Sequence, residues 1–139
     1  MSSVAAVRAL ARMSRLLERS CGDLSLAHYR VLSAVADGDE RASLVARRLA
    51  LGKPTISASV DALCARGLLV REEVAHDQRA TALRLTGAGE AVLRDAEAAM
   101  TARLDAVLAR TPRAAETRAA LVRLGVGLDK LSQERLASR

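Results

Sequence analysis

The sequence contains no Phe, Trp or Asn, a single tyrosine, Tyr29, and only two cysteines, Cys21 and Cys64. Two cysteines so far apart in the chain form neither a disulfide framework nor a metal knuckle, and His28 and His76 do not complete a ligand set. No apolar run approaches the roughly 20 residues of a transmembrane helix, and the arginine-rich N-terminus lacks the apolar stretch of a secretory signal. These absences predict a soluble cytoplasmic protein without a metal or cofactor.

The composition that is present predicts one globular domain over residues 1–139, since half of the residues are hydrophobic and 27% are charged. The net charge of +6 and the pI near 10.6 favour a nucleic-acid partner, although a merely soluble surface has a similar charge. Basic residues outnumber acidic ones in residues 41–80, whereas residues 21–40 are acidic. Lys53 and Lys130 are the only lysines, and this preference for arginine indicates a GC-rich, bacterial genome.

Apolar residues at helical spacing predict four helices in the first half of the chain. The first covers residues 4–19, and Ser25 caps a second. The third, short helix spans Ala42 to Leu49. The fourth has Pro54 in its first turn and ends at Arg66-Gly67. The inward faces are expected to carry Tyr29, Leu32, Val35 and Ala36 in the second helix and Val45, Ala46 and Leu49 in the third.

The pattern then changes to an alternation of apolar and polar residues, which predicts a β-hairpin. Its strands are residues 68–73 and 80–85, and residues 74–79 are expected to form a six-residue loop. Because a lone hairpin is only marginally stable, it must pack on the helices before it.

Two further helices are predicted after the hairpin. Thr86 restarts a helix that covers residues 90–109, and Thr111 and Pro112 are expected to be the N-cap and first residue of the last helix. The first and last helices have apolar residues at helical spacing that are expected to form a dimer interface, although they could instead close the core of the monomer. The expected interface residues are Val4, Val7, Leu10, Leu121, Leu124, Leu128 and Leu131.

This order of elements predicts a mainly α fold, a winged helix-turn-helix with N- and C-terminal dimerisation helices. The DNA-binding part is expected at residues 24–89, and the dimerisation part at residues 1–20 and 90–139. The helix at residues 54–66 is then the reading helix, because such a helix fits the major groove and a hairpin reaches the minor groove. Its buried stripe is expected to be Ile56, Val60 and Leu63, which leaves small and polar residues on the other side.

Four segments of the sequence resemble the MarR (multiple antibiotic resistance regulator) family of bacterial transcription factors. They are LSLAHYRVLSAVADG (24–38), SLVARRLALGKPTIS (43–57), VDALCARGLLVRE (60–72) and HDQRATALRLTGAGE (76–90). The resemblance implies a homodimer that binds double-stranded DNA at a pseudo-palindromic operator, usually as a repressor. It also implies release by a small effector, often phenolic or lipophilic.

The resemblance also carries DNA contacts over to particular residues. The family's reading-helix positions fall on Lys53, Pro54, Thr55, Ser57 and Ala58, and its wing arginine falls on Arg79, with Asp77 holding the wing in shape. The sequence departs from the family in two respects. Many relatives carry an arginine further along the reading helix, where this chain has Ser59, Val60 and Ala62. Relatives also often line their effector pockets with aromatic residues, whereas this chain has only Tyr29 to offer.

Two alternative functions remain open at this point. One is a winged-helix module that binds proteins and not DNA, and the other is a regulator that responds to oxidation of Cys21 or Cys64. An enzyme is disfavoured because the sequence shows no nucleophile–base set, paired carboxylates or phosphate loop.

Overall fold

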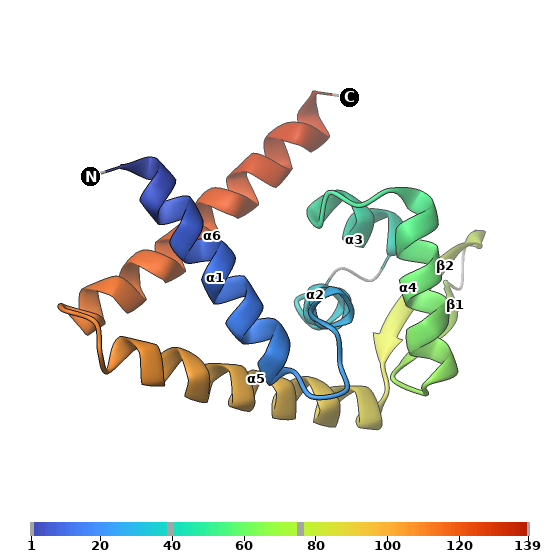
Figure 1. Ribbon diagram of the computed structural model, residues 1–139. Helices are drawn as coiled ribbons and strands as arrows, with labels where there is room; N and C mark the ends of the chain where they lie inside the picture. The colour runs from blue at the N-terminus through green and yellow to red at the C-terminus, as the bar shows by residue number, and fades with distance from the viewer. Residues whose placement is uncertain (1, 39–40, 75–76, 139) are drawn as a thin grey trace.

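The computed structural model describes the backbone of residues 2–38, 41–74 and 77–138, and the side chains of these residues except 74 and 77–80. Within these ranges the chain forms six helices and a two-stranded antiparallel hairpin (Figure 1). In chain order the elements are α1 (Ser3–Ser20), α2 (Leu26–Ala36), α3 (Ala42–Arg48), α4 (Lys53–Ala65), β1 (Leu69–Val74), β2 (Asp77–Leu85), α5 (Gly87–Leu108) and α6 (Ala114–Ala137). The predicted fold class is confirmed.

Hydroxyl caps define two of the helix starts, as the sequence predicts. The Ser25 hydroxyl accepts a hydrogen bond of 3.0 Å from the His28 amide at the start of α2. The Thr86 hydroxyl accepts one of 2.9 Å from the Gly89 amide and donates one of 2.6 Å to the Gly67 carbonyl. Thr86 therefore both begins α5 and ties it to the turn that ends α4.

The predicted start of the last helix is wrong. The Thr111 hydroxyl donates a 2.8 Å hydrogen bond to the Val107 carbonyl, so it serves the end of α5 and not the start of α6. Arg113, with a left-handed φ of 57°, is the N-cap, and α6 begins at Ala114, after Pro112. The hydroxyl of Thr111 thus bonds to the helix that precedes it, a choice that local sequence does not determine.

The core lies between α2, α3, α4 and the hairpin. Ile56, Val60 and Leu63 are at most 2% exposed, which confirms the predicted buried stripe of α4. The predicted inner face of α2 is only partly right, because Val31 and Ala34 are buried and Ala36 is exposed. Since α2 packs against α3, α4, α5 and β2, it is covered on more than one side, and a single apolar stripe does not describe it.

The second hairpin strand is longer than predicted, and the first is shifted by one residue with its length unchanged. β1 pairs with β2 in the register Leu69↔Leu85 and Arg71↔Leu83, with an irregularity between Glu73 and Val74. The predicted loop over residues 74–79 is therefore wrong, since residues 74 and 77–79 belong to strands. Backbone pairing continues past the last buried side chains, so the apolar alternation ends before the strands do.

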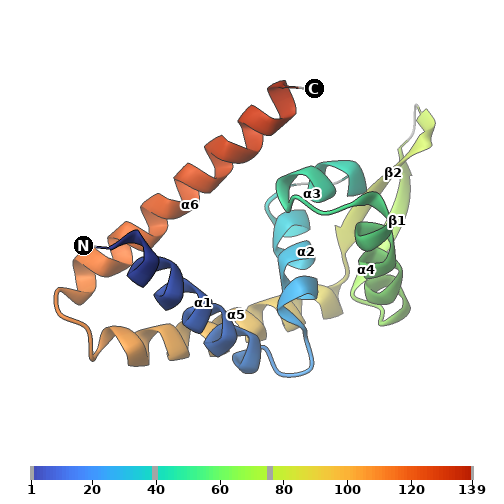
Figure 2. The ribbon, with the colours of Figure 1, turned by 45° about the horizontal axis from the view of Figure 1, so that its top comes forward.

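The remaining helices form long arms beside this compact unit. α5 begins under the hairpin and runs away from it, α6 turns back, and α1 crosses α6 before its C-terminal end meets α5 (Figures 1 and 2). Neither α1 nor α6 has a buried residue. Within the described ranges, none of the helices combines the length and apolar character needed to cross a lipid bilayer.

Candidate nucleic-acid interface

The exposed side of α4 is the centre of the candidate interface. The predicted reading residues Lys53, Pro54, Thr55, Ser57 and Ala58 are all exposed, and the buried stripe lies on the opposite side of the helix. Because Lys53 and Pro54 stand in the first turn, the unpaired amide groups and the positive end of the helix dipole lie beside the lysine. This end of α4 therefore combines a cation and amide donors, the groups that hold a phosphate.

The turn between α3 and α4 fixes the angle at which α4 is presented. Ala50 has a left-handed φ of 53°, and the Leu51 amide donates a 2.9 Å hydrogen bond to the Ala46 carbonyl. Gly52 then caps α4 without a side-chain hydrogen bond, which leaves the first turn open to solvent.

An ion pair that the sequence does not signal joins the reading helix to the hairpin. The Arg71 guanidinium in β1 bonds to the Asp61 carboxylate on the exposed side of α4, and this hydrogen bond raises the pKa of Arg71. The Asp61 carboxylate on its own would repel DNA phosphates. Arg71 offsets that charge and holds the hairpin against α4.

The hairpin extends beyond α4, as a wing does (Figure 2). Arg84 and Glu72 form an ion pair of 3.0 Å across its two strands. The predicted wing residues Asp77 and Arg79 belong to β2 by backbone pairing, but their side chains lie outside the described residues, and so does His76 entirely.

A second unpredicted connection links α3, which precedes the reading helix, to the last helix, α6. Arg48, at the end of α3, pairs with Asp37 at 3.1 Å and with Asp129 of α6 at 3.9 Å. The Ser132 hydroxyl of α6 also donates a 3.4 Å hydrogen bond to the Arg48 carbonyl. These residues are far apart in sequence, so only the folded chain brings them together.

The two cysteines lie in different surroundings. Cys21 is buried, donates a hydrogen bond to the Leu17 carbonyl and lies 3.4 Å from the Met100 sulfur. Burial, and to a smaller extent the Glu18 carboxylate, raises the pKa of the Cys21 thiol. Cys64 is half-buried, and its sulfur lies 3.9 Å from the Arg71 guanidinium.

This difference predicts the order in which the thiols react. Because the raised pKa lowers the thiolate fraction at neutral pH, the Cys64→Ser variant should react with Ellman's reagent at least about tenfold more slowly than Cys21→Ser. Equal reaction rates in the folded variants would contradict the placement of Cys21 in the core.

Known proteins have the same architecture. Residues 22–80 match the sequence model of the MarR family. The transcriptional repressor CouR, solved with a 23-mer DNA duplex, is 26% identical, with a TM-score of 0.77 and 91% of each chain covered. A MarR-family regulator from Silicibacter pomeroyi is 28% identical, with a TM-score of 0.67, covering 88% of this chain and 84% of that one.

The PcaV transcriptional regulator from Streptomyces coelicolor, in complex with its natural ligand, is 25% identical, with a TM-score of 0.69. That match covers 91% of this chain and 89% of PcaV. A comparison with curated protein sequences finds no match. The sequence match spans most of the winged helix and the structural matches extend over the arms, so the chain is similar in sequence and in fold to the MarR-family transcriptional regulators.

Proposed function

We propose that this protein is a homodimeric repressor that binds a pseudo-palindromic operator and is released by a small-molecule effector. The observation that carries the proposal is the division of α4 into a fully buried stripe and an exposed face that begins at Lys53. That face is what a recognition helix inserts into a major groove.

The exposure of these side chains on α4 supports a proposed role for each reading residue. Lys53 and the open first turn bind phosphate, while Thr55 and Ser57 reach base edges. Pro54 and Ala58 are apolar and small, which suits contact with a thymine methyl group. The described outer face of α4 carries no arginine, so recognition depends more on DNA shape than on paired hydrogen bonds to guanine.

The wing adds a second contact through Arg79, with Asp77 supporting it. Their position in β2 supports this assignment, because the hairpin reaches past the end of α4. Arginine is the side chain that narrow minor grooves attract most strongly.

Replacement of Arg79 tests this role. Arg79→Ala should weaken operator binding by about 1–3 kcal/mol in a fluorescence-anisotropy titration, because one groove contact is lost. Arg110→Ala is the matched control, since it removes one positive charge at the far end of α5, where the guanidinium bonds to the Ala106 carbonyl. Unchanged binding by Arg79→Ala would show that the wing does not touch DNA.

The arms provide the proposed dimer interface. Val4, Val7 and Leu10 of α1 are more than half exposed, and α6 exposes a longer series of apolar residues. The exposed apolar residues of α6 are Val122, Leu124, Val126, Leu128, Leu131 and Leu136, whereas Leu121 is half-buried. A second copy that covers these arms would place two reading helices on one side of the dimer, about 34 Å apart, as successive major grooves require. Residues 24–89 are then the DNA-binding part, and residues 1–20 and 90–139 the dimerisation part.

The connection between the two parts supports control by an effector. α5 starts at the wing and runs as one unbroken helix to the start of α6. A shift of α1 and α6 therefore moves the winged helix-turn-helix through α5. The related PcaV is solved with its natural ligand, and we extend ligand control to this chain on that basis.

A further inference from the structure

Four arginines form a continuous stripe along α1. They are Arg8, Arg12, Arg15 and Arg19. Their spacing of four, three and four residues places them within about 60° of one another around the helix, over a length of about 16 Å. All four side chains are exposed, whereas the opposite side of α1 carries Leu10 and the half-buried Leu17, which packs on the core. The stripe therefore faces away from the core and from the proposed dimer interface.

Carboxylates neutralise little of this stripe. Glu18 is the only acidic residue of α1, and it pairs with Arg15 at 3.2 Å. Among the residues that the structure describes, no carboxylate lies within ion-pair distance of Arg8, Arg12 or Arg19. Like charges one turn apart on a helix repel each other, and phosphate groups that lie between them relieve this repulsion.

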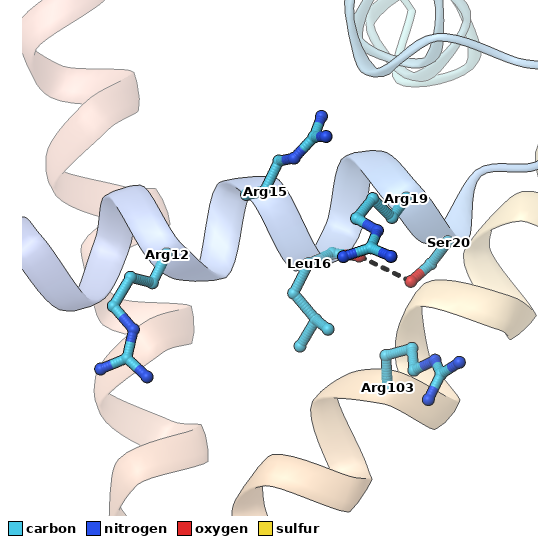
Figure 3. A pocket seen from close by; sticks show the side chains of 6 residues that line it. All are labelled: Arg12, Arg15, Leu16, Arg19, Ser20 and Arg103. Carbon is cyan, nitrogen blue, oxygen red and sulfur yellow. Dashed lines mark hydrogen bonds between the residues drawn. The ribbon is translucent and has the colours of Figure 1, made fainter.

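A fifth arginine widens the basic surface. Arg103 of α5 lines the same hollow as the last three arginines of the stripe. Figure 3 shows these three side chains fanning out from α1, with Arg103 below the end of the helix. Within the described part of the chain, Arg103 also has no carboxylate within ion-pair distance. The stripe and Arg103 together are called the α1 arginine surface below.

We propose that the α1 arginine surface binds the phosphate backbone of a second DNA duplex, so that one protein holds two DNA segments. Guanidinium groups bind phosphates through paired hydrogen bonds. Phosphates of one strand follow each other about every 3.4 Å along the duplex axis, so a row of arginines of this length spans several of them. Backbone contacts do not read bases, and we therefore expect this surface to bind DNA of any sequence.

The surroundings of the stripe favour duplex DNA over other polyanions. A basic helix that lies on a lipid bilayer inserts its apolar side, but in α1 that side packs on the core or belongs to the proposed dimer interface. Single-stranded nucleic acid is bound largely by stacking on aromatic side chains. Tyr29 is the only aromatic residue of the chain, and its hydroxyl donates a 3.3 Å hydrogen bond to Glu97. Phosphate contacts alone suit a duplex.

The second duplex differs from the one that α4 binds. In both views α2 lies between α1 and α4 (Figures 1 and 2). The buried stripe of α4 faces the core that includes α2, so the exposed face with Lys53 points away from α1. A duplex on α4 therefore leaves the α1 arginine surface free.

A bridging assay tests this proposal with the full-length protein. Beads that carry a long biotinylated duplex of random sequence should capture a second, fluorescent duplex when the protein is added at low salt, and capture should fall as salt rises. A variant with both Arg12→Gln and Arg19→Gln should capture at least about fivefold less, because two phosphate contacts are lost. The variant with Arg12→Lys and Arg19→Lys should recover most of the capture, since lysine also binds phosphate.

Arg94→Gln with Arg110→Gln is the charge-matched control. Both residues are exposed on or just after α5, outside the α1 arginine surface, so this variant should bridge as the wild type does. Anisotropy on one duplex selected from a random-sequence library measures binding through α4 separately, and the Arg12→Gln, Arg19→Gln variant should match the control there. A wild type that binds the selected duplex but captures no second one would overturn the proposal. So would equal bridging by the Arg12→Gln, Arg19→Gln variant, which would place both duplexes on the reading helices, or binding to phosphatidylserine vesicles without capture of a second duplex.

Discussion

Gly89→Ala should lower the free energy of unfolding by about 3 kcal/mol, because a methyl group at this position collides with the backbone. A Cβ at Gly89 would lie 2.1 Å from the Leu68 carbonyl oxygen. The same oxygen accepts a 3.1 Å hydrogen bond from the Thr86 amide, so it cannot move away without breaking the junction between the hairpin and α5. Chemical denaturation followed by circular dichroism, at one protein concentration, measures the loss.

Gly87→Ala provides the matched control for this prediction. Gly87 stands two residues earlier in the same helix, is exposed, and its Cβ would meet no atom within 4 Å. Alanine at this position should leave stability unchanged or raise it by up to about 1 kcal/mol, because alanine favours the helix. A Gly89→Ala protein as stable as the wild type would show that α5 does not approach the chain at Leu68.

Leu128→Asp should convert the dimer to monomers or aggregates and lower operator affinity at least about a hundredfold, because each protomer then binds one half-site alone. Leu124→Asp should have the same effect. These side chains are 63% and 53% exposed in the single chain, so the aspartates cost the isolated fold little. In a dimer they bury an uncompensated charge.

Light scattering distinguishes the two states, since the wild type should have twice the chain mass of 14.7 kDa. Glu134→Lys is the control, because Glu134 is exposed and lies at least about 60° around α6 from each apolar residue named for the interface. That variant should stay dimeric. A well-folded dimer of Leu128→Asp with normal DNA affinity would refute the proposed interface.

The sequence predicts the features of this fold that depend on local pattern. Ile56, Val60 and Leu63 recur at helical spacing, so their burial in α4 follows from the spacing alone. Ser25 and Thr86 begin helices for the same local reason, since their hydroxyls bond to amides three residues ahead.

The features that the sequence does not predict depend on contacts between distant residues. The Asp61–Arg71 pair requires that α4 and β1 pack together, and Arg48 meets Asp129 only because α6 passes α3. The α1 arginines resemble an ordinary charged helix face until α5 brings Arg103 beside them.

Two boundaries differ from the prediction for reasons that local pattern does not contain. Thr111 lies between α5 and α6, and its hydroxyl donates its hydrogen bond to the end of α5 and does not cap α6. β2 starts earlier than the apolar alternation because backbone pairing needs no apolar side chain.

The most direct test of the central claim is selection of DNA duplexes from a random-sequence library, followed by anisotropy titration of the selected duplex at several salt concentrations. We expect enrichment of a pseudo-palindrome that binds two chains with nanomolar affinity, at least about a thousandfold tighter than random DNA, and more weakly as salt rises. No enrichment, with equally weak binding to every duplex, would contradict it and would favour a winged helix that binds a protein partner.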